Sequence, residues 1–364
     1  ASDRLHRFVI EGMRDNQARL DQTHVTYFPY LEDEPDAGKG LLAALADRAC
    51  VVVSDDYPCF FLPRMVRAAK QQIPVRFELI DSNGLYPMRA TEKVFARAFD
   101  FRRHLQKELR DHLEDFPRQH PLQGAPLEEL NRIPKSITDK WPAADVAKLA
   151  EAYDALQQFL IDHDVAPALM AGGANAAQAT LDDFIENKLP AYGEDRNQPE
   201  QDVASGLSPY LHFGHIAAHQ VFDTVMQREQ WSPNQLSTKV NGSKDGWWGT
   251  SETAESFLDE LITWREVGYN MCALRDDYDQ YESLPDWARE TLSEHESDKR
   301  EHVYVLQQFE NGDTHDDLWN AAQNQLVREG RMHNYLRMLW GKKILEWSAS
   351  PRDALDVMIE LNNK

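Results

Sequence analysis

A glutamate and a tryptophan stand four residues apart in the segment Phe257–Glu266, at Glu260 and Trp264. In a helix this spacing places both side chains on one face. A carboxyl group can hydrogen-bond the edge of a nucleobase and an indole can stack on its plane, so the pair has the chemistry for base recognition. An exposed helix with a partly buried tryptophan would give the same pattern, and the spacing leaves both interpretations open.

A short polar motif, Ser205-Gly206-Leu207-Ser208, precedes a helical run. Its two hydroxyls and the neighbouring backbone N–H groups could bind a phosphate at the start of that helix. Serine caps usually serve only the helix itself, so the motif alone is a weak indication of phosphate binding.

A stripe of aromatic and basic side chains is predicted in the second half of the segment Asp316–Trp347. At spacings of three, four and three, the stripe contains Arg337, Trp340, Ile344 and Trp347. An amphipathic helix buries such a stripe. The basic residues from Arg328 onward are Arg328, Arg331, Arg337, Lys342 and Lys343, against Glu329 and Glu346. A local basic patch indicates an anionic ligand; core tryptophans with solvated or paired cations are the simpler interpretation, and the pattern alone favours it.

Other chemistries find little support in the sequence. No convincing catalytic triad is present, and Cys50, Cys59 and Cys272 are scattered, without the spacing of a zinc site or a disulfide framework. This cysteine usage favours a reducing cytoplasm. The longest apolar stretches, such as Ala49–Val53, fall far short of the ~20 residues that span a bilayer, and the charged first residues do not resemble a secretory signal.

The overall charge is strongly acidic, with 61 Asp and Glu against 39 Lys and Arg and a formal net charge of -22. Such an average argues against nucleic acid, because phosphate contacts depend on Lys and Arg. An acidic surface with one basic concavity is still compatible with DNA binding, although acidity that merely keeps the protein soluble is the more ordinary explanation.

The 364 residues can form a large core and two lobes. Residues 49–54 read as a strand of the buried parallel kind and residues 75–80 as a second strand, with a helix at 63–71 between them, which makes a βαβ unit. Almost every other periodic segment is helical, including 1–22, 41–47, 91–116, 143–164 and 174–188. We therefore expect a partial α/β lobe at 1–117, a connector at 118–172 and an all-α lobe at 173–364.

Several strings, taken in their order along the chain, go beyond these patterns: SGLSPYLHFGHI, FLDELITWRE, YESLPDWA, THDDLWNAAQ, GRMHNYLRMLWGKKILEW and IELNN. They closely resemble the photolyase/cryptochrome family, and specifically its class II cyclobutane pyrimidine dimer photolyases. DSNGLYPMR at Asp81–Arg89, with the βαβ unit before it, resembles part of that family's N-terminal antenna lobe. The resemblance is specific from Tyr192 onward and looser in the first third of the chain.

This resemblance implies a helical lobe that binds FAD and a light-driven DNA repair activity on cyclobutane dimers. Its cofactor-binding positions are Tyr192, Ser205, Gly206, Leu207, Ser208, Asn334, Arg337 and Asn362. Among them Asn362 resembles the asparagine that hydrogen-bonds flavin N5, which tunes the electronics of the cofactor. Glu260 and Trp264 match the residues that bind the dimer, and Trp319, Trp340 and Trp347 match an electron-transfer path. Candidates for DNA phosphates are Arg196, Arg265, Lys342 and Lys343, which could equally be surface or ion-paired side chains.

The chain also departs from the family pattern. The first strand and helix of the antenna lobe are not recognisable, which leaves an antenna chromophore uncertain, and the sequence stops before a GRDP-containing loop. Residues 242–250 resemble an inserted loop, in which Trp247 and Trp248 have no assigned role. We expect a monomer that acts on UV-damaged DNA without a membrane or an obligate protein partner. A cryptochrome-type photoreceptor and a non-catalytic helical DNA-binding or scaffold protein are the alternatives, and the presence of both Glu260 and Trp264 favours repair.

Overall fold

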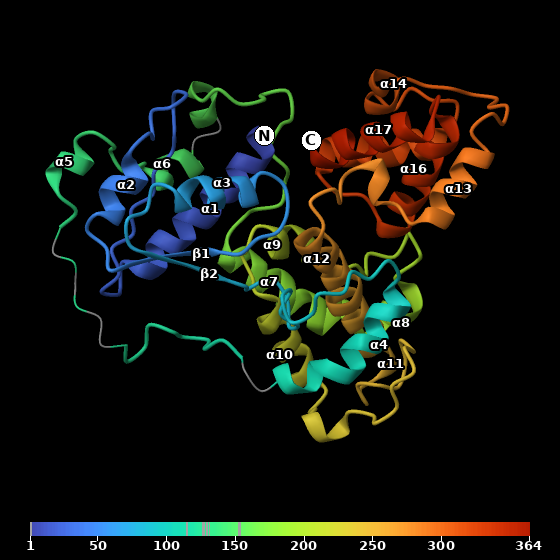
Figure 1. Ribbon diagram of the computed structural model, residues 1–364, viewed down its shortest axis with the longest axis horizontal. Helices are drawn as coiled ribbons and strands as arrows, with labels where there is room; N and C mark the ends of the chain where they lie inside the picture. The colour runs from blue at the N-terminus through green and yellow to red at the C-terminus, as the bar shows by residue number, and fades with distance from the viewer. Residues whose placement is uncertain (1, 114–115, 126–127, 129, 131, 152–153) are drawn as a thin grey trace.

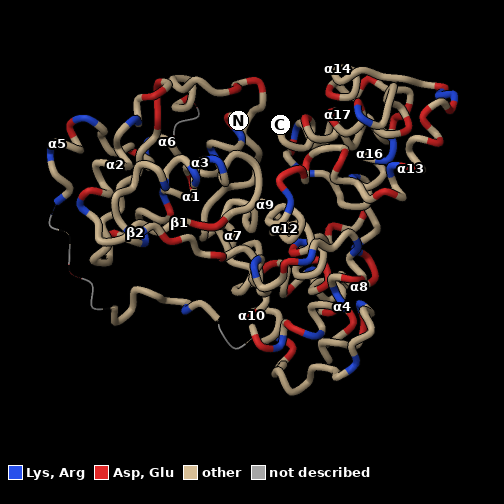
Figure 2. Tube along the Cα trace, in the orientation of Figure 1, with Lys and Arg blue, Asp and Glu red and all other residues tan. Residues whose placement is uncertain are grey.

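The computed structural model describes residues 2–113, 116–125, 128, 130, 132–151 and 154–364. Figure 1 shows the N-terminal elements on one side of the molecule, the C-terminal helices on the other side, and the middle of the chain below and between them. Acidic residues are spread over all of these parts, as Figure 2 shows. The acidity is therefore a property of the whole surface, not of one segment.

The first half of the chain contains two strands and several helices. They are α1 Asp3–Leu20, α2 Leu41–Ala46, β1 Val51–Asp55, α3 Leu62–Lys70, β2 Arg76–Ile80, α4 Ala98–Glu108, α5 Lys135–Thr138 and α6 Val146–Glu151, with the 3-10 helices η1 Leu109–His112 and η2 Ala155–Gln158.

The described part of the second half is helical. It contains α7 Ala174–Asp183, α8 Leu189–Asp195, α9 Ser208–His212, α10 Ala218–Arg228, α11 Glu252–Leu258, α12 Arg265–Leu274, α13 Asp286–Glu294, α14 Leu306–Glu310, α15 Asp317–Glu329, α16 Asn334–Trp347 and α17 Pro351–Asn363. Two π-helices, η3 Phe184–Lys188 and η5 Asp259–Trp264, and two 3-10 helices, η4 Pro233–Gln235 and η6 Tyr281–Ser283, lie among them.

The predicted βαβ unit is confirmed, because β1 and β2 pair in parallel, from Val51 opposite Arg76 to Asp55 opposite Ile80. The prediction that the first strand is buried is wrong, since Val53 is 56% exposed, and Ile80 of the second strand is 48% exposed as well. Within the described residues the sheet has these two strands alone, and α3 buries none of its side chains. The strands therefore lack the cover on both faces that a buried parallel sheet has.

Three predicted helices are shorter than expected or divided. The one predicted at 91–116 begins at Ala98, and the one at 143–164 becomes α6 and η2, with residues 152–153 outside the described part. The one at 316–347 becomes α15 and α16. These two helices separate at Gly330, whose φ of 71° lies in the left-handed region that glycine adopts readily at the end of a helix.

Three clusters of buried side chains form the core. The largest lies among α4 and the helices from α7 to α12 and includes Phe184 and Leu258. A second packs α15, α16 and α17 together around tryptophans. A third holds α1 against α6 and includes Ile10 and Val146. The second cluster contains the residues of the predicted electron-transfer path.

Several polar contacts join the N-terminal elements to the helical region. Glu266 of α12 accepts hydrogen bonds from the backbone N–H groups of Leu85 at 2.7 Å and Tyr86 at 3.1 Å. Near the N-terminus, Arg4 donates to the carbonyl oxygens of Leu326 and Val327 at the end of α15. The proposed lobe boundaries remain predictions, and these contacts cross them.

Candidate functional site

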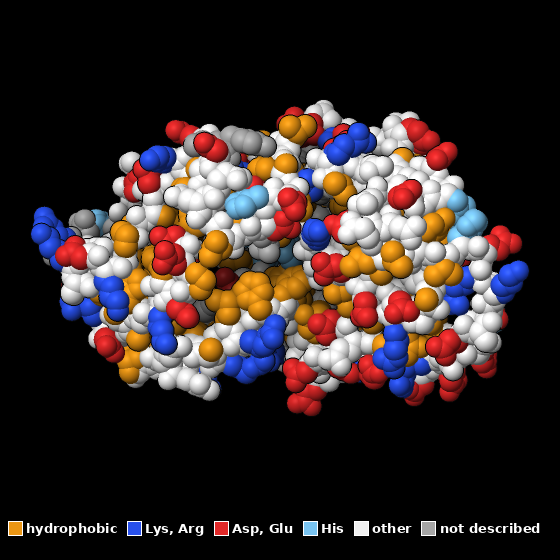
Figure 3. All heavy atoms as spheres, turned by 90° about the horizontal axis from the view of Figure 1, so that it is seen from above, with side chains coloured by type: hydrophobic (Ala, Val, Ile, Leu, Met, Phe, Trp, Pro, Cys, Tyr) orange, Lys and Arg blue, Asp and Glu red, His pale blue; other side chains and the backbone are white. Residues whose placement is uncertain are grey.

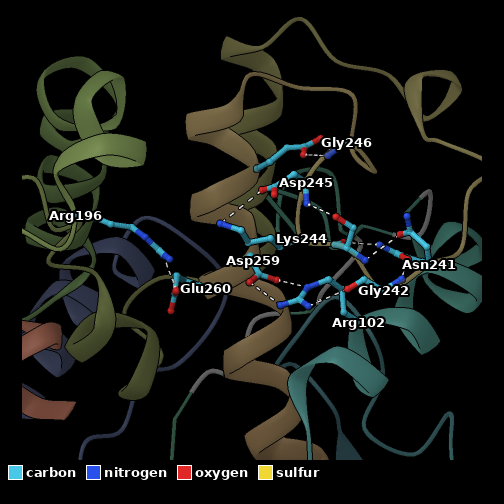
Figure 4. Close-up of polar contacts among 12 residues, drawn as sticks. Arg102, Arg196, Asn241, Gly242, Lys244, Asp245, Gly246, Asp259 and Glu260 are labelled. Atoms are coloured by element: carbon cyan, nitrogen blue, oxygen red, sulfur yellow. Dashed lines mark hydrogen bonds and ion pairs between the residues drawn. The ribbon is translucent and has the colours of Figure 1, made fainter. Parts of the chain in front are cut away.

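The segment that carries Glu260 and Trp264 is one long helical run made of α11, η5 and α12. Its middle, η5, is a π-helix, a local widening of the helix that occurs frequently at functional sites. Neighbouring residues of η5 point to opposite sides of the run: Figure 4 shows Asp259 directed toward Arg102 and Glu260 directed toward Arg196. Trp264, at the end of η5, is 54% exposed. An indole this accessible is available to stack on a ligand.

Glu260 forms an ion pair with Arg196, which follows α8. Arg196 Nη1 donates to Glu260 Oε1 at 2.6 Å, and the Arg196 guanidinium lies 5.8 Å from the centre of the Tyr192 ring. Burial, and after it the Glu260 carboxylate, raises the pKa of the Tyr192 hydroxyl, so this group stays neutral. The three side chains therefore offer a carboxylate, a guanidinium and a neutral hydroxyl at one place.

On the other side of η5, Asp259 fixes the helix to α4. Arg102 Nε and Nη2 donate to its two carboxylate oxygens at 2.7 Å and 2.8 Å, and Arg102 Nη1 donates to Gly242 O at 3.1 Å. The pair is almost fully buried. Because a bidentate pair fixes direction as well as distance, Arg102 orients η5 and with it Glu260.

The Ser205–Ser208 motif adopts a tight turn before α9. The Ser205 hydroxyl accepts a hydrogen bond from Leu207 N–H at 3.3 Å, and Gly206 has a φ of 70°. Ser208 is exposed, whereas the Leu207 side chain is 1% exposed and belongs to the main core. A ligand could therefore meet Leu207 through its backbone alone, and the assignment of this segment to the cofactor stays a prediction.

This turn is connected to the beginning of α16. Asp202, just before the motif, forms an ion pair with Arg331 at 3.6 Å, and Arg331 lies three residues before Asn334. Asn334 and Arg337 are exposed and hydrogen-bonded to each other, from Nη2 to Oδ1 at 3.3 Å. Asn362 is exposed near the end of α17, which packs against α16. These predicted cofactor-binding residues thus lie on the turn before α9, on α16 and on α17, and the contacts above link these elements to one another.

The three tryptophans of the predicted path are buried in one cluster, in which Trp319 contacts the other two. The Trp319 and Trp340 rings are parallel, with an interplanar angle of 2° and centres 6.4 Å apart, and the Trp347 ring lies 6.1 Å from Trp319. Trp319 Nε1 donates to Trp340 O at 3.2 Å, and Trp340 Nε1 donates to Gln323 Oε1 at 2.9 Å. Indoles at such distances can exchange an electron by short steps. Arg337, expected on the same buried stripe, is instead exposed.

The basic residues predicted to contact phosphates are mostly engaged with protein groups. Arg265 donates to Asn83 O and to the Tyr269 hydroxyl, and Lys343 pairs with Glu346 at 2.8 Å. Arg196 pairs with Glu260 as described above, and Lys342 is exposed on α16. A DNA phosphate would have to compete with these internal partners, except where the side chain is already at the surface.

Trp247 and Trp248, for which the sequence suggested no role, are core residues. Both are buried in the largest cluster, and Trp231 Nε1 donates to Trp248 O at 2.6 Å. Glu255 of α11 accepts hydrogen bonds from the backbone of Gly246 and Gly249 and so holds this loop. The loop therefore completes the core beside η5. The sequence feature that could have indicated this packing is the pair of adjacent tryptophans in a glycine-containing loop.

The chemistry of the predicted cofactor-binding side chains is compatible with FAD. Exposed amide, hydroxyl and guanidinium groups of Asn334, Ser208 and Arg337 suit the pyrophosphate and the flavin carbonyls. Figure 3 shows one face of the molecule hollowed at its middle, where hydrophobic side chains gather with charged side chains around them. Among the described residues, no group of His, Cys, Asp and Glu could hold a metal ion, and no helix is long and apolar enough to cross a membrane.

Two kinds of comparison relate the chain to known proteins, whereas no protein-family model matches it. It is 32% identical to the deoxyribodipyrimidine photo-lyase of Methanothermobacter thermautotrophicus, covering 100% of this chain and 72% of that protein. It is 31% identical to the deoxyribodipyrimidine photo-lyase of Arabidopsis thaliana, covering 98% and 67%, and 40% identical over 205 residues to that of Potorous tridactylus, covering 56% and 35%.

Solved structures agree on the fold. A class III photolyase from Agrobacterium tumefaciens superposes with a TM-score of 0.60 at 16% identity, and a Synechocystis sp. PCC6803 cryptochrome with a TM-score of 0.64 at 14% identity. Each match covers 98% of this chain and 70% of the other. The fold is that of photolyases and cryptochromes, and the chain belongs to the deoxyribodipyrimidine photo-lyase family.

Proposed function

We propose that this protein is a class II photolyase, which uses light to split cyclobutane pyrimidine dimers in UV-damaged DNA. The observation that carries the proposal is the Glu260–Arg196 pair together with the exposed Trp264 at the end of the same π-helix as Glu260, because these groups can recognise a pyrimidine that has left the helix. A damaged and poorly stacked pair costs the least to flip out of the duplex.

Each group has a distinct task in the proposed site. The Glu260 carboxylate accepts a hydrogen bond from a pyrimidine ring N–H, and the Arg196 guanidinium donates to the carbonyl oxygen beside it. Trp264 stacks on the dimer and keeps water from its ring. The guanidinium also stabilises negative charge that develops on that carbonyl oxygen during splitting.

FAD would be held by Tyr192, the Ser205–Ser208 turn, Asn334, Arg337 and Asn362. When bound and reduced, it would supply the light-excited electron that opens the cyclobutane ring and recover that electron afterwards. The buried Trp319, Trp340 and Trp347 would relay electrons from the surface to restore the reduced state. No nucleophile is required for such chemistry, in keeping with a sequence that offers no triad.

The proposal also covers the lobes, the oligomeric state and the location of the protein. We retain a helical FAD-binding lobe at 173–364, a partial antenna-type lobe at 1–117, a monomer and a cytoplasmic location as expectations from the sequence. A cryptochrome-type photoreceptor is the second candidate, because the fold is shared with the Synechocystis cryptochrome. It differs from the first in needing no lesion pocket.

The test compares Glu260→Gln and Trp264→Ala in pre-reduced protein under blue light. We expect Glu260→Gln to lower the repair yield per absorbed photon and to weaken discrimination for dimer-containing over intact DNA, since a hydrogen bond in a desolvated pocket contributes about 1–3 kcal/mol. Trp264→Ala should weaken binding of the damaged strand by a similar amount, about 1–3 kcal/mol. Binding is measured at one fixed salt concentration.

Two matched variants serve as controls. Glu282→Gln alters a glutamate that also pairs with an arginine, Arg352 at 2.7 Å, and Trp287→Ala alters another exposed tryptophan. Both should repair and bind like the parent. If Glu260→Gln and Trp264→Ala also repair and bind like the parent while the flavin is retained, the lesion pocket is misplaced. If the parent itself binds flavin and repairs no dimers, the photoreceptor function replaces repair.

A further inference from the structure

Two cysteines that are far apart in the sequence meet where the N-terminal elements contact α12. Cys59 lies between β1 and α3, and Cys272 lies on α12. The two thiols lie close enough for each to change the acidity of the other. Cys50, the third cysteine of the chain, is exposed at the start of the β1 region.

Contacts on both sides of Cys59 fix its position along α12. The Tyr57 ring packs edge-on against Tyr269 with ring centres 5.7 Å apart, and Phe60 N–H donates to the Tyr278 hydroxyl at 2.8 Å. Phe60 has a φ of 61°, in the left-handed region that a non-glycine residue seldom adopts. Cys59 lies between Tyr57 and Phe60, and Cys272 lies between Tyr269 and Tyr278. The two contacts therefore hold Cys59 near Cys272.

The two thiols differ in their acidity. The interaction with Cys59 lowers the pKa of Cys272, whereas the interaction with Cys272 and burial raise the pKa of Cys59. Both side chains are only partly buried. A small reagent can therefore reach them, and Cys272 is the thiol that reacts first, since the thiolate is the nucleophile.

We propose that Cys59 and Cys272 are a redox-sensitive pair that a small-molecule disulfide converts into an intramolecular disulfide. The Cys272 thiolate attacks one sulfur of the reagent and releases its other half as a thiolate. Cys59 then loses its proton and attacks the sulfur of Cys272 in this mixed disulfide, which releases the second thiolate. The two protein thiols lose two electrons and two protons, and the reagent is reduced to two thiols.

The bond would connect the helix that carries the proposed lesion site to the N-terminal part of the chain. Cys272 lies on the helix that continues directly from η5, with Glu260 and Trp264, and Cys59 lies on the segment that follows β1. In the reduced protein, non-covalent contacts alone hold the Cys59 segment against α12. In a reducing compartment such pairs usually form disulfides only transiently, in response to an oxidant.

The experiment uses the full-length Cys50→Ser variant, treated with excess glutathione disulfide. Cys50 is removed because it shares a tryptic peptide, residues 49–64, with Cys59, whereas Cys272 lies in residues 266–275. Mass spectrometry of the unreduced digest should show these two peptides joined and separated again by dithiothreitol. The oxidised protein should melt higher than the reduced protein, by on the order of 5 °C.

Two further variants separate the steps. Cys50→Ser/Cys59→Ser should stop at a mixed glutathione disulfide on Cys272, and Cys50→Ser/Cys272→Ser should react more slowly. The proposal is overturned if the Cys50→Ser protein stays reduced in excess glutathione disulfide, or if it carries two separate glutathione adducts and no joined peptides. Circular dichroism and melting of the reduced variants verify that each of them folds.

Discussion

Trp340 is fixed in place by hydrogen bonds at both its ring and its backbone. Its indole N–H donates to Gln323, and its carbonyl oxygen accepts from the indole of Trp319. A buried indole N–H needs such a partner, because leaving it unpaired would cost about 1–3 kcal/mol. The network thus sets the parallel orientation of the Trp319 and Trp340 rings on which the proposed electron path depends.

We expect Trp340→Phe to abolish photoreduction of oxidised flavin and to leave repair by chemically pre-reduced protein nearly unchanged. A phenyl ring is far harder to oxidise than an indole, whereas the aromatic replacement keeps most of the packing. Flash absorption spectroscopy of the flavin bands measures the first effect, and repair under blue light measures the second.

Trp141→Phe is the matched control, since Trp141 is also buried and its indole donates a single hydrogen bond, to Ala37 O at 3.0 Å. It lies outside the tryptophan cluster and should photoreduce like the parent. Undiminished photoreduction in Trp340→Phe would remove this residue from the path.

Some residue positions followed from spacing, and others did not. Periodicity predicted that Trp340, Ile344 and Trp347 are buried together, and this is confirmed. It also placed Arg337 on that stripe, which is wrong: the guanidinium is exposed at the first turn of α16, because burying an unpaired charge is far more costly than leaving it in water. The partner of Glu260, Arg196, lies 64 residues away, beyond any periodic pattern.

At the scale of elements, the π-helix η5 is the feature that the sequence did not reveal. The expectation of a shared face for Glu260 and Trp264 assumed an α-helix, whereas Asp259–Trp264 is wound more widely. Nothing in its composition marks this winding, and the contact of Asp259 with Arg102 of α4 joins residues 157 positions apart, beyond any local pattern. The break between α15 and α16, by contrast, is indicated in the sequence by Gly330, a glycine within a helical pattern.

We expect Asp259→Asn to destabilise the protein by about 3 kcal/mol, because it removes one charge of a buried, bidentate pair and leaves Arg102 uncompensated. Repair should fall as well, since η5 would lose the contact that orients it. Urea unfolding gives the stability, and the repair assay of pre-reduced protein gives the activity.

Asp100→Asn is the comparison, since Asp100 pairs with the exposed Arg97 at 2.8 Å on the same helix, α4. A surface pair contributes about 0–1 kcal/mol. Equal losses in the two variants would show that the Arg102 pair has no special role in holding η5.

At the scale of the whole molecule, the fold class followed from the sequence, whereas the way its parts meet did not. Strand and helix periods, together with the family resemblance, predicted an α/β part and a helical part. The joint between them is built from long-range contacts: Glu266 with Leu85 and Tyr86, and Asn270 with Lys93 and Phe95. Gly84 fits this joint because a Cβ atom there would lie 2.6 Å from the Glu266 carboxyl carbon.

Glu266 makes this joint dependent on pH. Burial raises the pKa of its carboxyl group from 4.5 to about 7, although the N–H groups of Leu85 and Tyr86 oppose the shift. The folded protein therefore holds a proton that the unfolded chain has released. The resulting stabilisation is fully present below about pH 4.5 and is lost as the pH rises through about 7, and its size is about 3 kcal/mol.

We expect Glu266→Gln to remove this pH dependence, because a glutamine side chain does not ionise. Urea unfolding between pH 5 and pH 8 gives the free energy of unfolding of each protein, and the advantage of the parent over the variant should shrink as the pH rises. Glu282→Gln is the control, since pairing with Arg352 lowers the pKa of Glu282 from its ordinary 4.5, away from the range tested. Its difference from the parent should stay constant. A constant difference for Glu266→Gln as well would mean that the buried carboxyl group is already ionised at pH 5, and that the two backbone N–H donors, not burial, determine its charge.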